Sequence, residues 1–518
     1  MTSSTSDYAS KTFPKNSGNA RKLVFAAALL GVFAFAAYMR FRGIDSRPMH
    51  CDEAVQAYKV GEMLAGEIYR YDPTDFHGPA LYFFAFWLSK IFGIASFAEL
   101  SETFLRGVPA TIGALGCVAI PLAFFGRRPV PVFISGTLLA AAAPAVFYSA
   151  YFIQETLLVV FAWTSAGIFF FRKKTLGNAV FAGALAGLAV ASKETWILAA
   201  FAFLVANVSE NAFSPARGRE IFAGKFARVF ARVFARIAVF LASAGIVGAL
   251  FYSSFGKNPH GLADFFSAFP HYVAKAKISE TFPGGNAESP QAFSQIFPAA
   301  LCGILLCAVA GFLASRILSR TWKFIEKISA RTFPSALQSV AIFSGASAIA
   351  LGIVHLKMEY CTPWLFLGIV PGIALAVAGF ATIFFRGKPR LALAGALTIF
   401  VAWAVFFRPE ENRIFRFEHT GERVSEIAKT VANARTEFVA NGGNEADFFV
   451  AVLADEYWPL PWYLRRERVG YFGEKFANAP PANAPFVIAD FGFENENFCP
   501  IFEFELRPGV ILSAQRRR

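Results

Sequence analysis

The feature that most limits the fold of this chain is a series of apolar runs that reach or approach the length of a membrane span. A spanning helix needs about 20 mainly apolar residues. Of the 518 residues 56% are hydrophobic and only 16% are charged, which excludes a soluble globular protein of this length. The sequence therefore predicts a mainly α-helical, polytopic membrane protein. The runs lie at 23–39, 79–94, 107–125, 130–148, 156–171, 176–191, 195–208, 237–255, 296–314, 336–354, 363–385 and 391–407.

The positive charges of the loops predict how these spans are oriented. The run at 79–94 has about 16 residues, short of a full span, and is expected to be a juxtamembrane or re-entrant helix. The later loops then alternate, with 19 Lys and Arg residues on one side and 5 on the other. Because Lys and Arg gather in short cytoplasmic loops, we expect eleven spans in the cell inner (plasma) membrane and a cytoplasmic amino terminus. The same rule accounts for the net charge of +13, so no nucleic-acid partner is expected.

The last part of the chain is more polar than the rest. "RVSEIAKTVANART" has helical periodicity, and "DFFVAVLAD" and "PFVIAD" are typical of buried strands. Strands that alternate with helices predict a small α/β domain. We therefore expect a cytoplasmic tail at 1–22, a membrane module at 23–407 with a first outer loop at 40–105, and an extracytoplasmic α/β domain at 408–518.

Ionisable groups that are unusual in so apolar a chain gather on the predicted outer side. Asp52 and Glu53 open the first outer loop, and Arg106 stands at the outer end of the next span. Lys193 and Glu194 form the tip of a tight turn between two spans. Other members of the set are His77, Tyr71, Gln154, Glu155, Lys357, Glu359 and Trp364. Because ionisable groups close to hydrocarbon are costly, each one is a hypothesis for a functional residue.

Each member also has a structural explanation. Asp52 and Glu53 can cap and solvate a juxtamembrane helix, and Arg106 can snorkel from the end of its span. Lys193 and Glu194 are expected to form an ion pair that closes their turn. What favours a functional site is that all of these groups lie on one predicted face of the membrane.

Transfer of a sugar from a lipid phosphate requires residues of these types at this depth. A carboxylate accepts the proton of the attacking hydroxyl, and cations stabilise the departing phosphate. Asp52, Glu53 and Glu155 are the candidate catalytic residues. The sequence demands no cofactor, although these three carboxylates can bind a divalent cation if they converge. The candidates for binding the donor and its phosphate are Arg106, Lys357, Lys193, His77, Tyr71, Gln154, Glu359 and Trp364.

Taken together, several motifs resemble those of membrane glycosyltransferases of the C superfamily. They are "MHCDEAVQAYKVGEML", "YRYDPTDFHGPALYF", "YFIQETLLV", "SKET", "TPW" and "WPLPWYLR". The chain is similar to the branch of protein O-mannosyltransferases and aminoarabinose transferases, and most similar to the prokaryotic flippase-activity-associated proteins. The resemblance implies a polyprenyl-phosphate sugar as donor and Asp52 as catalytic base, with Glu53 as its acidic neighbour. It also implies that Arg106 is an active-site arginine and that Glu155 is the acidic residue of the second outer loop.

Two positions depart from that family's pattern. Ala150 stands where an arginine is common, and Cys361 stands where a lysine is common. The sequence still predicts a membrane glycosyltransferase that moves a sugar from a polyprenyl-phosphate donor to an unknown acceptor (a glycan, lipid or protein) on the extracytoplasmic face. The loss of two cations leaves an alternative, a non-catalytic accessory protein or a transporter involved in flipping lipid-linked sugars. The chain shows no convincing repeat between its halves, which favours the enzyme over a transporter.

Overall fold

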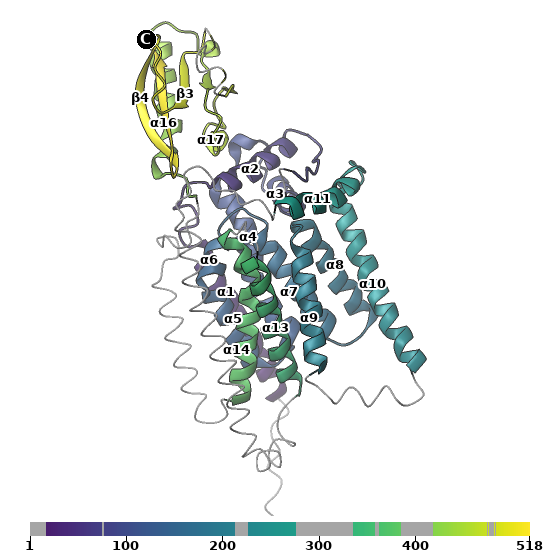
Figure 1. The fold of residues 1–518 in the computed structure, drawn as a ribbon. Helices are drawn as coiled ribbons and strands as arrows, with labels where there is room; N and C mark the ends of the chain where they lie inside the picture. The colour runs from purple at the N-terminus through teal and green to yellow at the C-terminus, as the bar shows by residue number, and fades with distance from the viewer. Residues whose placement is uncertain are drawn as a thin grey trace, which may run out of the picture.

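A bundle of helices with a small sheet at one end forms the protein (Figure 1). The computed structural model describes residues 17–74, 77–212, 226–275, 335–357, 362–384, 418–473, 475, 481 and 483–518. The sheet lies at the same end of the bundle as α2, α3 and α11 (Figure 1). We call this the head end and the opposite end the foot end.

The described helices follow one another along the chain with short connections in the first half. They are α1 (Ser17–Phe41), α2 (Cys51–Leu64), α3 (Ala80–Ile91), η1 (Phe97–Glu99), α4 (Glu102–Phe125), α5 (Pro129–Ala141), α6 (Ala143–Ser149), α7 (Glu155–Phe171), α8 (Leu176–Ser192), α9 (Trp196–Ala212), α10 (Phe226–Tyr252), α11 (Gly261–Lys275), α13 (Ser335–Lys357), η4 (Pro363–Gly368) and α14 (Ile369–Phe384). The C-terminal domain adds η7 (Glu422–Glu426), α16 (Ile427–Ala440), η8 (Glu445–Asp447) and α17 (Leu460–Tyr463).

Several of these helices are long and apolar enough to cross a membrane. In the described ranges there are four, and a fifth if α5 and α6, bent by 60°, count as one span. Shorter apolar helices accompany them, among them α7, α8 and part of α9. The runs expected at 296–314 and 391–407 lie outside the described residues. The mainly helical membrane fold is therefore confirmed, whereas the count of eleven spans and their orientation remain predictions.

The run at 79–94 does not form a full span. Its helix α3 has 12 residues, about 18 Å of helix against a hydrocarbon core of about 30 Å. The chain enters α3 through Gly78, where a side chain would collide with the carbonyl of Ala191 at the end of α8. A glycine is therefore required at this contact, which holds α3 at the head end, as Figure 1 shows.

A buried arginine stabilises the break between α5 and α6. Arg40 of α1 is only 2% exposed, and its guanidinium donates to the carbonyls of Leu139 (3.3 Å) and Ala140 (3.4 Å) in the last turn of α5. The last carbonyls of a helix lack helical partners and carry partial negative charge, so a cation there satisfies both needs. Sequence analysis did not single out Arg40, because a lone arginine at the end of a span usually snorkels.

The C-terminal domain contains a five-stranded mixed sheet in the order β2-β1-β3-β5-β4. β1 pairs in parallel with β2 and β3, whereas β5 runs antiparallel to β3 and β4. Helix α16 buries Ile427 and Val431 in one core with residues of the sheet. The predicted helix and both predicted strands are confirmed, whereas the β4–β5 hairpin was not predicted. The strands are β1 (Val450–Val452), β2 (Val469–Tyr471), β3 (Phe486–Asp490), β4 (Phe498–Arg507) and β5 (Val510–Arg517).

Candidate active site

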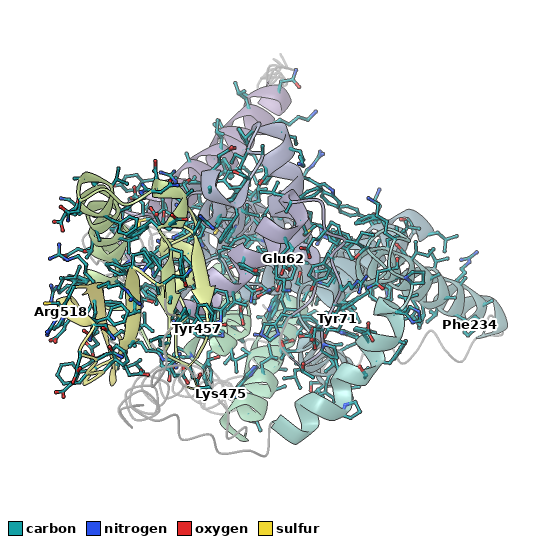
Figure 2. All side chains as sticks on the ribbon, turned by 90° about the horizontal axis from the view of Figure 1, so that it is seen from above. Glu62, Tyr71, Phe234, Tyr457, Lys475 and Arg518 are labelled. Carbon is teal, nitrogen blue, oxygen red and sulfur yellow. The ribbon has the colours of Figure 1, made fainter. Side chains whose placement is uncertain are left out.

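The C-terminal domain docks on the segment that leads into α2. The backbone N–H of Met49 donates to the hydroxyl of Tyr463 (2.7 Å), and Thr420 donates its hydroxyl to the Met49 carbonyl (2.7 Å). The indole N–H of Trp462 donates to the carboxylate of Glu102 at the start of α4 (2.7 Å). Figure 2 looks down on this end and shows Tyr71 near the middle of the molecule. These bonds hold the backbone of Met49, just before α2, and the start of α4 against the C-terminal domain.

Asp52 stands in the first turn of α2. His50 is the N-cap, and its Nδ1 accepts the backbone N–H of Asp52 (3.2 Å) while the Glu53 side chain accepts the N–H of His50 (3.0 Å). This reciprocal pair is a capping box, and it leaves the proton of a neutral His50 ring on Nε2. The Asp52 side chain is half-buried, and among the described residues its carboxylate accepts one long contact, from the Cys51 thiol (3.7 Å). The Asp52 carboxylate therefore keeps acceptor capacity for a substrate.

Glu53 and Arg106 form a closed, fully buried network; both are 0% exposed. The Nε and Nη2 atoms of Arg106 each donate to the Glu53 carboxylate at 2.8 Å. The three remaining N–H groups donate to carbonyls of the loop before α2, those of Ile44, Arg47 and Pro48. A guanidinium has five N–H groups, so all of them are in use.

The Glu53 carboxylate is equally saturated. Besides the two bonds from Arg106 it accepts the backbone N–H groups of His50 and Phe152, the latter at 2.9 Å. Burial alone raises the pKa of the Glu53 carboxyl, but the adjacent Arg106 guanidinium outweighs burial and holds that pKa below its usual value. In this state the pair holds the site together, and Glu53 has no lone pair and Arg106 no N–H left for a substrate.

The segment between α6 and α7 lies against α2. Gln154 donates to Gln56 of α2 (2.9 Å), which also accepts the hydroxyl of Tyr82. The next residue, Glu155, forms a buried ion pair with Lys193 at the turn between α8 and α9. Gln154 and Glu155, at the start of α7, thus contact both α2 and the turn between α8 and α9.

Glu194 is bound by the segment between α2 and α3. Its carboxylate accepts the hydroxyl of Tyr71 (2.7 Å) and contacts Nδ1 of His77 (3.2 Å). Burial raises the pKa of the Glu194 carboxyl, but the bond to His77 more than offsets burial and lowers it below its usual value. The expected ion pair between Lys193 and Glu194 is wrong, because adjacent residues at the turn point to different partners.

An aromatic cluster borders the start of α2. The ring of His50 packs against those of Tyr151, Trp364 and His419 at centroid distances of 5.8–6.0 Å. The Tyr151 hydroxyl lies 2.6 Å from Nε2 of His419, a residue of the C-terminal domain. Sequence analysis missed His419, since a single histidine after an apolar run carries no motif.

The guanidinium of Arg47 lies over the rings of Phe147 and Tyr151, at 4.5 and 4.3 Å. It also donates to the carbonyl of Ala150 (2.8 Å). A cation from the first outer loop therefore reaches the position where the resembling family carries an arginine.

A group of three potential metal-ligand atoms occurs at the start of α2. One atom each from His50, Cys51 and Asp52 lie within 4.8 Å of one another. Among the described residues, Asp52, Glu53 and Glu155 do not form such a group. Glu53 and Glu155 are bound to Arg106 and Lys193, and binding of a divalent cation remains a prediction.

Two cavities lie beside the aromatic cluster around His50. A polar cavity of about 500 Å³ separates the C-terminal domain from the loop before α2. A narrow apolar cavity between α7, α9, α13 and η4 is lined by Glu155, His355 and Trp364. Trp364 follows Pro363 at the start of η4. The polar cavity is lined by Asp45, Ser46, Arg47, Pro48, Glu102, His419, Thr420, Glu422, Ser425 and Tyr463.

Two candidates are not placed. Lys357 is the last residue of α13, and its side chain is outside the described part. Glu359 lies outside the described residues, as does Cys361. Their proposed contacts with the donor therefore remain predictions.

No family model matches the chain, and no curated protein matches it. Solved structures do. ArnT from Cupriavidus metallidurans bound to undecaprenyl phosphate aligns with a TM-score of 0.54 at 15% identity, over 96% of this chain and 98% of ArnT. Its apo state gives 0.53 at 16% identity, with the same coverage. The archaeal oligosaccharyltransferase AglB from Archaeoglobus fulgidus gives 0.47 at 15% identity, over 91% of this chain and 70% of AglB.

At such identities the likeness concerns the fold alone. The fold expected from the resemblance is supported by the likeness to ArnT, while the assignments to the C superfamily and to the flippase-activity-associated proteins remain predictions. The chain is similar in fold to ArnT over nearly its whole length.

Proposed function

We propose that this protein is a membrane glycosyltransferase that moves a sugar from a polyprenyl-phosphate donor to an acceptor at the head end. The observation that carries the proposal is the half-buried carboxylate of Asp52, which has acceptor capacity beside a network that uses every polar atom of Glu53 and Arg106. The fold supports it, since the similar structure of ArnT holds undecaprenyl phosphate.

Asp52 acts as the general base. It accepts the proton of the acceptor hydroxyl while the hydroxyl oxygen bonds to the anomeric carbon of the donor sugar. The bond from that carbon to the phosphate oxygen breaks, and polyprenyl phosphate leaves with the electron pair. Glu53 cannot take this role in the described state, because its oxygens already accept four hydrogen bonds. Glu53 and Arg106 instead position Asp52.

The departing phosphate needs a cation. Arg106 has no N–H group free, so this role falls to Lys193, which Glu155 holds in place, and to Lys357 at the end of α13. His77 and Tyr71 orient the turn from which Lys193 extends, through Glu194. Gln154 and Trp364 form the adjoining wall.

The acceptor enters through the polar cavity between the C-terminal domain and the loop before α2. Its volume of about 500 Å³ lies in the range of small-molecule sites. His419, which lines this cavity, also packs against His50, and His50 precedes Asp52 by two residues. The C-terminal domain is thus assigned a share in acceptor binding.

Filling this cavity is expected to separate acceptor binding from donor chemistry. Ser425→Trp introduces an indole at an exposed, cavity-lining position and should lower transfer to acceptors extracted from the cell envelope by about 10- to 100-fold, because the acceptor is misplaced. Release of donor sugar to water should stay unchanged. Thr436→Trp, at an exposed position of α16 away from the cavity, is the matched control. Equal transfer by both variants would remove the cavity from the proposal.

The alternative is a non-catalytic accessory protein or transporter for lipid-linked sugars. It is favoured by the fact that all N–H groups of Arg106 already donate hydrogen bonds within the protein, which leaves one fewer cation to bind a phosphate. One experiment decides between them. The full chain in lipid vesicles is given labelled polyprenyl-phosphate sugars, and both donor binding and sugar release are measured. Sugar release establishes the transferase, whereas binding without release from any donor supports the accessory protein.

A further inference from the structure

A groove on the membrane-facing side of the bundle is not used by the proposed reaction. It lies between α4, α7 and α8, has a volume of about 440 Å³ and is almost entirely apolar. Leu115 and Phe181 at its rim are 50% and 57% exposed, which opens the groove to the surrounding lipid. Its lining residues include Ile112, Ala119, Phe161 and Ile168.

The groove has one charged end. Arg172, which follows the last residue of α7, closes it at the foot end. The Nη2 atom of Arg172 donates to the carbonyl of Phe124 at the end of α4, and a side chain at Gly126 would collide with the guanidinium. The cation is therefore held against the end of the groove.

Positive charge accumulates around Arg172. Arg128 lies near enough for the two guanidinium groups to repel each other electrostatically, and Arg127 is its neighbour in sequence. Within the part of the chain that the structure describes, none of these three arginines forms an ion pair with a carboxylate. The Nε of Arg172 is buried and has no hydrogen-bond partner among the described residues. A cation that closes an apolar groove, with a second arginine close to it, is complementary to a ligand with an anionic head and a hydrocarbon tail.

We propose that this groove binds an anionic phospholipid, with one acyl chain between α4, α7 and α8 and its phosphate on Arg172 and Arg128. The occupant is not the polyprenyl-phosphate donor, because the cations lie at the foot end and Asp52 lies at the head end. The site is independent of the proposed transferase activity. Basic pockets between spanning helices are the type of surface that anionic lipid heads recognise.

The test measures lipid binding to the purified full chain by native mass spectrometry, with phosphatidylglycerol and phosphatidylcholine added at equal concentration. The wild type should retain phosphatidylglycerol in preference. Arg172→Gln should weaken that binding about fivefold, the effect of about one basic residue at a membrane surface. Loss of both Arg172 and Arg128 should weaken it further, and neither change should alter binding of phosphatidylcholine.

Two further variants separate the site from general attraction of acidic lipid. Arg232→Gln removes an exposed arginine of α10 near the foot end but outside the groove, and should bind phosphatidylglycerol as the wild type does. Ala119→Trp fills the groove and should weaken binding with every charge kept. Equal losses in Arg172→Gln and Arg232→Gln would overturn the proposal. So would displacement of the lipid by polyprenyl phosphate, which would assign the groove to the donor.

Discussion

Asp52→Asn is expected to lower the rate of sugar transfer by about 10²- to 10⁴-fold, the usual contribution of a general base. The amide has the shape of the carboxylate but does not accept the proton of the acceptor hydroxyl. Donor binding should not change, because Asp52 contacts the acceptor rather than the phosphate. The measurement is turnover of labelled polyprenyl-phosphate sugar by the full chain in vesicles, with donor binding determined in parallel.

The structure also predicts that Asp52→Asn folds normally. The carboxylate accepts one long contact, from the Cys51 thiol, and the cap of α2 is made by His50 and Glu53. The change therefore leaves the capping bonds intact and should alter the free energy of unfolding by no more than about 1 kcal/mol, through the helix dipole. Glu62→Gln, in the last turn of the same helix, is the control and should keep full turnover. Full turnover by Asp52→Asn would instead require another base.

Much of the fold could be predicted because it depends on local patterns. Apolar length predicts membrane helices, the short run at 79–94 predicts the short helix α3, and "SKET" predicts the turn between α8 and α9. The head-end assembly of Asp52 and Glu155 followed from charge counts in loops. These features need only the spacing of residue types along the chain.

The partners of the charged residues could not be predicted in the same way. Arg106 and Glu53 are 53 positions apart, and Lys193 and Glu155 are 38 positions apart. Because pairing over such distances depends on how helices pack, the sequence alone favours the wrong partner for Lys193, its neighbour Glu194. The sequence contains the correct residues, but only the packed bundle selects their partners.

Arg47 shows how a departure in the sequence can be compensated in space. Ala150 lacks the cation that is common at this position in the resembling family. The guanidinium of Arg47 donates to the carbonyl of Ala150 and lies over the ring of Tyr151. It therefore places a positive charge beside Ala150, although Arg47 is about a hundred positions earlier in the chain. A motif comparison counts this position as a loss because it compares residues only in register.

Arg106→Met is expected to destabilise the protein by about 3–5 kcal/mol, the cost of leaving one member of a buried ion pair without its partner. It leaves the Glu53 carboxylate buried and the carbonyls of Ile44, Arg47 and Pro48 without donors. Glu53→Gln should cost a similar amount. The double variant should cost much less than the sum, because the two residues act as one unit. Arg423→Met, which removes an exposed ion pair with Glu426, should change stability by less than about 1 kcal/mol.

The pH dependence of unfolding distinguishes this structural role from binding of the donor phosphate. In the wild type the pKa of Glu53 is lowered by Arg106, so its contribution to stability is present above the pKa of the unfolded chain and is lost as the pH falls through the lower folded value. In Arg106→Met burial remains and the cation is gone, so the folded pKa of Glu53 rises above the unfolded value. The variant should then lose stability as the pH rises from about 4 to 7, a trend opposite to that of this pair in the wild type. If Arg106 mainly binds the donor, Arg106→Met should keep wild-type stability at every pH and show only a raised KM.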